Sequence, residues 1–175
     1  MKKAFLHSGS TVRFNLRAFR AADFEILHEI DQACYEPEIA YSRSELREYL
    51  RFPGAECVIA ESEGAIAGFC LAARKDDYGH IITIDVLRSF RRRRAGTALL
   101  AEIERRLSAD GAREIWLETA TDNEPAIAFW QKHGYRKRGL RKGYYPGNRD
   151  AYAMSKRVSA SPAEAAARTD DSGER

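Results

Sequence analysis

Apolar residues recur along the chain with two different spacings, and each spacing predicts one kind of element. Alternating or continuously apolar runs predict strands at 13–18, 57–61, 65–74, 80–86, 135–140 and 151–154, and a further strand that begins with 115–117. Apolar residues three or four positions apart, such as Phe24, Leu27 and Ile30, predict helices at 22–33, 42–50, 95–107 and 124–133. The order is β-α-α-β-β-β-α-β-α-β-β, which is typical of one α/β domain around a mixed sheet.

Capping and turn residues support these boundaries. Ser42 followed by Glu45 is a capping box at the start of the second helix. Asn123 followed by Pro125 predicts the start of the last helix. The turn at 62–64, Ser-Glu-Gly, predicts that the two apolar runs around it pair as an antiparallel hairpin.

We expect residues 1–158 to form one domain and residues 159–175 to form a disordered tail. The tail has no aromatic or large aliphatic side chain to bury in a core. It holds four acidic and two basic residues, so a chain with a net charge of +3 has a domain with a charge of +5.

Composition narrows the class of protein. With 44% hydrophobic residues, 31% charged residues and no long apolar run, the chain is expected to be globular and to have no membrane partner. Its cysteines are odd in number and form no C-x-x-C pair, which favours a reducing compartment and a cytoplasmic location. The sequence has no zinc-ligand spacing, so we expect no metal.

The positive charge is concentrated in two segments, and one of them predicts an anion site. Residues 125–149 contain seven lysines or arginines and no acid. The second cluster consists of Arg88 and the four arginines 91–94, between the strand 80–86 and the helix that begins near Ala95. Free N–H groups at a helix start, together with arginine side chains, bind anions such as a pyrophosphate. A solvated basic surface or a nucleic-acid patch is the alternative interpretation.

The arginine-rich turn resembles the pyrophosphate loop of the GNAT superfamily of acetyl-CoA-dependent N-acetyltransferases, which reads Arg/Gln-x-x-Gly-x-Gly/Ala. The match is Arg91-x-x-Arg94-x-Gly96, in which Arg94 takes the place of the family's first glycine. A strained non-glycine backbone at that position costs about 1–3 kcal/mol. The resemblance implies acetyl-CoA as the cosubstrate, no metal, and a mainly antiparallel sheet with two splayed parallel strands.

Residues 116–135 resemble the next motif of the superfamily, in which an asparagine contacts the pantetheine arm and an aromatic helix packs against the cofactor. This implies cofactor contacts for Asn123 and for Phe129 or Trp130, while Asn123 can also be a helix cap. The full set of residues expected to bind acetyl-CoA is Val86, Leu87, Arg91, Arg92, Arg93, Arg94, Ala95, Gly96, Thr97, Asn123, Phe129 and Trp130.

Residues 142–154 resemble the Tyr-Tyr loop and Asp-Ala strand of RimI-type ribosomal-protein acetyltransferases and of their N-alpha-acetyltransferase relatives, and the resemblance spans residues 13–156. In those enzymes this loop and the segment between the first two helices enclose the peptide amino terminus. The resemblance therefore implies Tyr35, Tyr144 and Tyr145 as substrate contacts. For the tyrosine pair, packing within a β-hairpin is the alternative.

The same resemblance implies catalytic roles for Glu118 and His80, which match the positions of the base in relatives and would lie on adjacent parallel strands. The alternatives are an exposed strand end and a surface histidine. The tyrosine that protonates the thiolate in RimI-type enzymes is here Trp130, whose indole N–H cannot serve as an acid. We expect Tyr144 or Tyr145 to replace it, or the thiolate to leave unassisted. Backbone N–H groups near Val86 and Leu87 are expected to polarise the carbonyl oxygen.

We therefore expect an enzyme that transfers an acetyl group from acetyl-CoA to the α-amine of a protein or peptide amino terminus. An α-amine has a pKa of about 7.7–8.0 and a lysine one of about 10.4, so the α-amine needs only a modest base near pH 7. One alternative acceptor is a lysine side chain or a small-molecule amine, such as a polyamine or an antibiotic. A second alternative is a non-catalytic module that binds nucleic acid or coenzyme A, although the small net charge speaks against nucleic acid.

Overall fold

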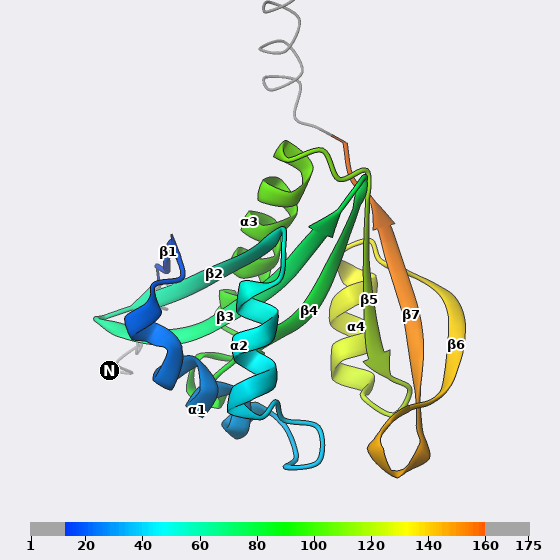
Figure 1. The fold of residues 1–175 in the computed structure, drawn as a ribbon, viewed down its shortest axis with the longest axis horizontal. Helices are drawn as coiled ribbons and strands as arrows, with labels where there is room; N and C mark the ends of the chain where they lie inside the picture. The colour runs from blue at the N-terminus through cyan, green and yellow to red at the C-terminus, as the bar shows by residue number, and fades with distance from the viewer. Residues whose placement is uncertain (1–12, 160–175) are drawn as a thin grey trace, which may run out of the picture.

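The computed structural model describes residues 13–159, which form one curved sheet with helices on both faces (Figure 1). The helices are α1 (Phe24–Cys34), α2 (Arg43–Arg51), α3 (Ala95–Ala109) and α4 (Glu124–Lys132). The strands are β1 (Asn15–Ala18), β2 (Ala55–Ser62), β3 (Ala65–Lys75), β4 (Tyr78–Val86), β5 (Glu114–Ala120), β6 (Arg136–Tyr145) and β7 (Arg149–Arg157). The predicted order of elements is confirmed.

The sheet has the order β1-β2-β3-β4-β5-β7-β6, and all neighbours in it are antiparallel except β4 and β5. These two strands pair over only three positions, from Tyr78 opposite Glu114 to His80 opposite Trp116. Beyond that point they separate, and Figure 1 shows them meeting near the top of the view and diverging downward. The predicted mixed sheet with two splayed parallel strands is therefore confirmed.

Each face of the sheet has its own apolar core. On one face, Leu99 and Ile103 of α3 pack with Trp130 of α4 and with Ile115 of β5. On the other face, α1 and α2 contribute the fully buried Leu27 and Leu46. Burial of each such side chain stabilises the fold by about 1.5–3 kcal/mol.

The last two strands are longer than the sequence predicted. The pattern indicated 135–140 and 151–154, but β6 and β7 have 10 and 9 residues. Every residue of β6 except Tyr145 is exposed, because β6 is an edge strand and is rich in lysine and arginine. Such a strand has no apolar alternation along most of its length, so its second half was predicted as a loop.

Two further predictions concern the tail and membrane-spanning segments. The tail 159–175 lies outside them except for Ser159, so the domain boundary and the disordered tail stay predictions. Among residues 13–159, no helix combines the length and the apolar composition needed to cross a membrane.

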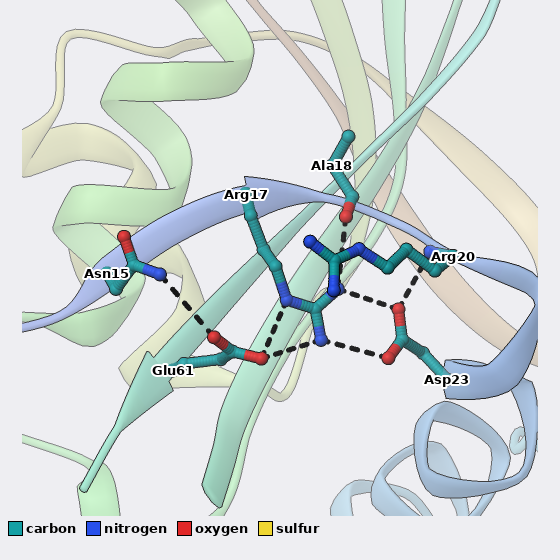
Figure 2. A network of polar contacts seen from close by, with 6 residues as sticks. All are labelled: Asn15, Arg17, Ala18, Arg20, Asp23 and Glu61. Carbon is teal, nitrogen blue, oxygen red and sulfur yellow. Dashed lines mark hydrogen bonds and ion pairs between the residues drawn. The ribbon is translucent and has the colours of Figure 1, made fainter. Parts of the chain in front are cut away.

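A partly buried ion-pair network joins the first strand to the start of α1. Arg17 on β1 donates to both carboxylate oxygens of Asp23, at 2.7 and 2.9 Å, and its Nε donates to Glu61 of β2 at 2.6 Å. Asp23 also accepts from the backbone N–H of Arg20 at 2.7 Å. Figure 2 shows Arg17 between the two carboxylates, which ties β1, β2 and the chain entering α1 together.

We predict that Asp23→Asn destabilises the protein by about 1–3 kcal/mol at pH 7, since it leaves a mostly buried arginine without its bidentate partner. The hydrogen bonds from Arg17 lower the pKa of Asp23, so the native carboxylate contributes stability above pH 4 that is lost as the pH falls through its folded pKa. Urea unfolding from pH 7 to pH 3 should show the difference between wild type and variant shrinking. Glu25→Gln removes an exposed carboxylate paired with Arg43 and should have little effect, and an equal loss in both variants would contradict the prediction.

Candidate active site

The candidate residues lie at two places, the split between β4 and β5 and the start of α3. Residues 87–94, which include a 3-10 helix at Arg88–Phe90, connect β4 to α3, and Val86 at the end of β4 lies next to Gly96 in the first turn of α3. His80 is at the last paired position of β4, and Glu118 lies two residues beyond its partner Trp116 on β5. The pair of catalytic candidates therefore marks the point where the strands part.

The start of α3 presents the N–H groups that a helix leaves unpaired. The first hydrogen bond of the helix runs from the N–H of Ala98 to the carbonyl of Arg94, so the N–H groups of Ala95, Gly96 and Thr97 precede the ladder. The side chains of Arg92, Arg93 and Arg94 are exposed and make no polar contact within residues 13–159. A helix terminus of this kind, with three free guanidinium groups, can hold a phosphate or pyrophosphate.

The backbone of this turn is strained where the sequence suggested that it would be. Arg94 is the N-cap of α3 and has φ 71° and ψ 8°, in the left-handed region that favours glycine. Arg92 also has a positive φ, of 62°. Two non-glycine residues therefore hold conformations that cost about 1–3 kcal/mol each. Since Arg94 takes the place of a family glycine, the turn keeps the glycine conformation with a charged side chain.

Gly96 has no side chain although the surrounding protein would accommodate one. A Cβ atom built on Gly96 would lie 3.5 Å from the ring of Phe129 and 3.9 Å from Val86, which are ordinary contact distances. Its φ is not positive, so neither packing nor backbone strain demands a glycine. The absent side chain instead leaves room beside the free N–H groups of α3. These residues fit a pyrophosphate-containing cosubstrate such as acetyl-CoA.

The two residues at the end of β4 differ in what they offer a ligand. The N–H of Leu87 donates to the carbonyl of Ala67 at 3.0 Å, so the expectation that it polarises a thioester carbonyl is wrong for this group. The carbonyl of Val86 accepts from Nε of Arg91 at 2.9 Å, which holds the first arginine of the turn back against the strand. The side chain of Val86 faces the gap beside Gly96.

The remaining cofactor candidates divide into a surface group and a core group. The side chain of Asn123 caps α4 by accepting from the N–H of Ala126 at 3.2 Å, which leaves its amide NH2 free. Trp130 is only 5% exposed and packs edge-to-face against Tyr135. Of the two aromatic candidates on α4, the half-buried Phe129 is therefore the one that borders the gap.

Glu118 is the centre of a polar cluster at the split. Its Oε2 lies 2.7 Å from Nε2 of His80 and 3.4 Å from the hydroxyl of Tyr144, and its Oε1 lies 3.1 Å from Nε of Arg141. The hydroxyl of Tyr145 donates to the backbone carbonyl of Glu118 at 3.4 Å. The structure thus brings together all the residues proposed for catalysis and both tyrosines of the pair.

These contacts determine the charge state of the cluster. Burial alone would raise the pKa of Glu118, but the hydrogen bond and charge of His80 and the charge of Arg141 outweigh it and lower that pKa. Glu118 is therefore ionised near pH 7 and can only accept, so Nε2 of His80 carries a proton. Burial and the Glu118 charge raise the pKa of Tyr144, and burial raises the pKa of Tyr145 to about 12. Both phenols stay protonated.

The third tyrosine candidate behaves differently. The hydroxyl of Tyr35 lies 3.0 Å from Oγ1 of Thr83, which donates to Asp85 at 2.7 Å, so the phenol points into the sheet. Its hydroxyl is therefore occupied within the fold, and a role for Tyr35 as a substrate contact stays a prediction. Asp85 is 1% exposed, and burial raises its pKa to about 7.

Sequence reasoning missed Arg141 and Asp85. Arg141 lies on the edge strand β6, whose register against β7 shifts between Arg141 and Tyr145. The sequence pattern therefore does not predict that its side chain contacts Glu118. Asp85 did carry a signal, since it is an acid within the apolar run of β4. Within residues 13–159 no group of three His, Cys, Asp or Glu side chains is placed to hold a metal ion.

Comparison with known proteins identifies similar chains. The family model described as "Acetyltransferase (GNAT) family" matches residues 24–135. The chain is 39% identical to the N-alpha-acetyltransferase of Saccharolobus solfataricus over 45% of this chain and 47% of that protein, so this match spans about half of each. It is 25% identical to the [ribosomal protein bS18]-alanine N-acetyltransferase of Escherichia coli over 82% and 97% of the two chains.

Two solved structures share the architecture. Ard1 of Thermoplasma volcanium superposes with a TM-score of 0.76 at 25% identity and covers 84% of this chain and 99% of its own. NAA60 of Arabidopsis thaliana in complex with acetyl-CoA superposes with a TM-score of 0.71 at 19% identity and covers 83% and 99%. The second similarity shows the fold, and that protein holds acetyl-CoA on it.

We predict that Arg94→Gly raises the free energy of unfolding by about 1 kcal/mol, because glycine adopts the left-handed conformation without strain while gaining some entropy in the unfolded chain. Arg93→Gly is the matched control, since it removes the same charge from a neighbouring exposed position that has no positive φ. Chemical denaturation of both variants checks this. A gain in Arg93→Gly as large as in Arg94→Gly would show that charge repulsion, and not strain, is relieved.

Proposed function

This chain belongs to the acetyltransferase (GNAT) family and is an N-acetyltransferase, and on that basis we propose that it acetylates the α-amine of a protein amino terminus with acetyl-CoA as the donor. The observation that carries the proposal is the Glu118 cluster at the split between β4 and β5. It combines an ionised carboxylate, a histidine and two phenols. The names of the bacterial and archaeal relatives support an amino terminus as the acceptor.

The start of α3 is the proposed site for the pyrophosphate of acetyl-CoA. The free N–H groups of Ala95, Gly96 and Thr97 would receive it, with the guanidinium groups of residues 92–94 around it. Phe129 and Val86 lie beside Gly96, and the side chain of Asn123 is at the start of α4, so these residues are the proposed contacts for the rest of the cosubstrate. Acetyl-CoA would supply an activated thioester carbonyl at the split.

Glu118 and His80 are proposed to receive the proton that the attacking amine loses. The amine nitrogen forms a bond to the thioester carbonyl carbon, and its extra proton leaves to the cluster directly or through one water. The cluster is a modest base because the contacts of Glu118 lower its pKa. A modest base is sufficient for an α-amine, whose pKa of about 7.7–8.0 leaves it partly neutral near pH 7. The match between a weak base and a partly neutral α-amine favours an amino terminus over a lysine side chain as the acceptor.

Tyr144 is the candidate that returns a proton to the departing thiolate. Its hydroxyl stays protonated near pH 7, and it lies at the same carboxylate that accepts from His80. Trp130, at the position where the resemblance implied a tyrosine, is buried in the core and cannot take this role. A cytoplasmic location for this reaction stays a prediction from the cysteine pattern.

We predict that Glu118→Gln lowers kcat by about 100-fold and leaves the Kd for acetyl-CoA nearly unchanged, because the amide neither accepts the proton nor touches the start of α3. Glu114→Gln is the matched control on the same strand, since Glu114 pairs with Arg138 as Glu118 pairs with Arg141. Steady-state kinetics with a free amino-terminal peptide, together with calorimetry for acetyl-CoA, tests the prediction. Equal turnover in the two variants would contradict the role of Glu118.

We predict that kcat/KM rises as the pH increases through about 7.7–8.0, the pKa of the peptide α-amine. Titration of Glu118 does not cause this rise in kcat/KM, because its lowered pKa keeps the carboxylate ionised throughout that pH range. Replacing the peptide by one with a blocked amino terminus and a free lysine should give far lower rates. If the lysine peptide or a polyamine is acetylated instead, the proposed α-amine acceptor is wrong, while acetyl transfer from acetyl-CoA is still supported. Salt-sensitive DNA binding without acetyl-CoA binding would contradict both.

A further inference from the structure

Two adjoining hollows lie on the α2 side of the split, away from the start of α3. The first, of about 440 Å3, reaches Glu118 and His80. The second, of about 520 Å3, follows the outer side of α2. Phe52 lines both hollows, and we call the surface that the two make up the groove.

Aromatic side chains form the walls of this groove. Phe52 and Tyr78 are 49% and 52% exposed, although both are large and apolar. Tyr49 and Trp116 line the first hollow together with them. Exposed aromatic groups that surround a hollow next to a catalytic cluster are typical of a surface that contacts a ligand.

The charges that line the groove are mainly positive. The cations in its lining are Arg47, Arg51, Arg74, Lys75 and Arg141, and the acids in it are Glu48 and Glu118. Glu118 already accepts from His80, Arg141 and Tyr144. Arg51 and Lys75 are exposed and have no acidic partner in the part of the chain that the structure describes. Asp76 and Asp77 follow Lys75 in the turn before β4, and neither lines the groove.

The distance along β4 from the catalytic cluster to Lys75 equals the length of a short stretch of extended polypeptide. Lys75 pairs with Tyr78, and Tyr78 precedes His80 by two positions along β4. Two extended residues span about 7 Å. An acceptor with its amine at Glu118 would therefore bring the side chains of its next few residues beside Lys75 and Arg74.

We propose that this groove binds the acceptor polypeptide directly after its amino terminus and selects acidic segments there. The inference rests on the proposed function, and it adds a substrate class to it. Carboxylates at the second to fifth positions pair with Lys75, Arg74 and Arg51, while the aromatic walls contact the rest of the segment.

The test uses two peptides with the same free first residue, one with Asp and Glu at positions two to five and one with Asn and Gln. Wild-type enzyme should acetylate the acidic peptide with a kcat/KM at least about fivefold higher, as expected for an exposed ion pair of about 1 kcal/mol. The preference should decrease at 0.5 M salt, where exposed charges are screened. Lys75→Glu should reduce the ratio of the two kcat/KM values by about fivefold or more.

Arg13→Glu is the control, because Arg13 is an exposed cation before β1, at the far edge of the sheet, and should leave the ratio unchanged. Thermal unfolding of Lys75→Glu confirms that the variant is folded. Equal kcat/KM for the two peptides in wild type, or a ratio that Lys75→Glu does not change, overturns the inference while the proposed function stands. Failure to acetylate either peptide overturns both.

Discussion

The short pairing between β4 and β5 is the constraint on which the rest of the structure depends. Three parallel pairs hold the strands together, and the same sheet continues by antiparallel pairing on either side. A strand that leaves its neighbour exposes backbone and side chains that a continuous sheet would bury. Here that exposure is at the split between β4 and β5, and the Glu118 cluster lies there.

The site keeps two kinds of charge apart. The start of α3 has free N–H groups and guanidinium groups with no acidic partner among the described residues, which suits an anionic ligand. At the split, Glu118 provides a negative charge that three donors stabilise. A small net charge of +3 therefore conceals a strongly uneven distribution. The proposed function depends on that distribution, because it needs a positive site for phosphates and a separate negative site for an amine.

Much of the fold followed from the sequence because helix and strand periods are local properties. The pairing of His80 with Glu118 was also predictable, since both were assigned to adjacent parallel strands. The left-handed backbone of Arg94 was anticipated from the glycine that relatives have there. These three cases depend on residues close together in the chain or on one simple sheet pairing.

The rest depended on register and burial, which no local pattern contains. Arg141 reaches Glu118 from an edge strand whose register shifts, and β6 was predicted too short to hold it. The hydroxyl of Tyr35 turns inward because Thr83 and Asp85 offer it buried partners on β4. The N–H of Leu87 is not available to a ligand because the carbonyl of Ala67 on the neighbouring strand accepts from it.

The edge strand β6 has a further consequence for the protein. Its five lysines and arginines lie beside an open row of backbone groups, where a second copy of the strand could otherwise pair. Like charges on both copies oppose such pairing and so protect the protein from edge-to-edge aggregation.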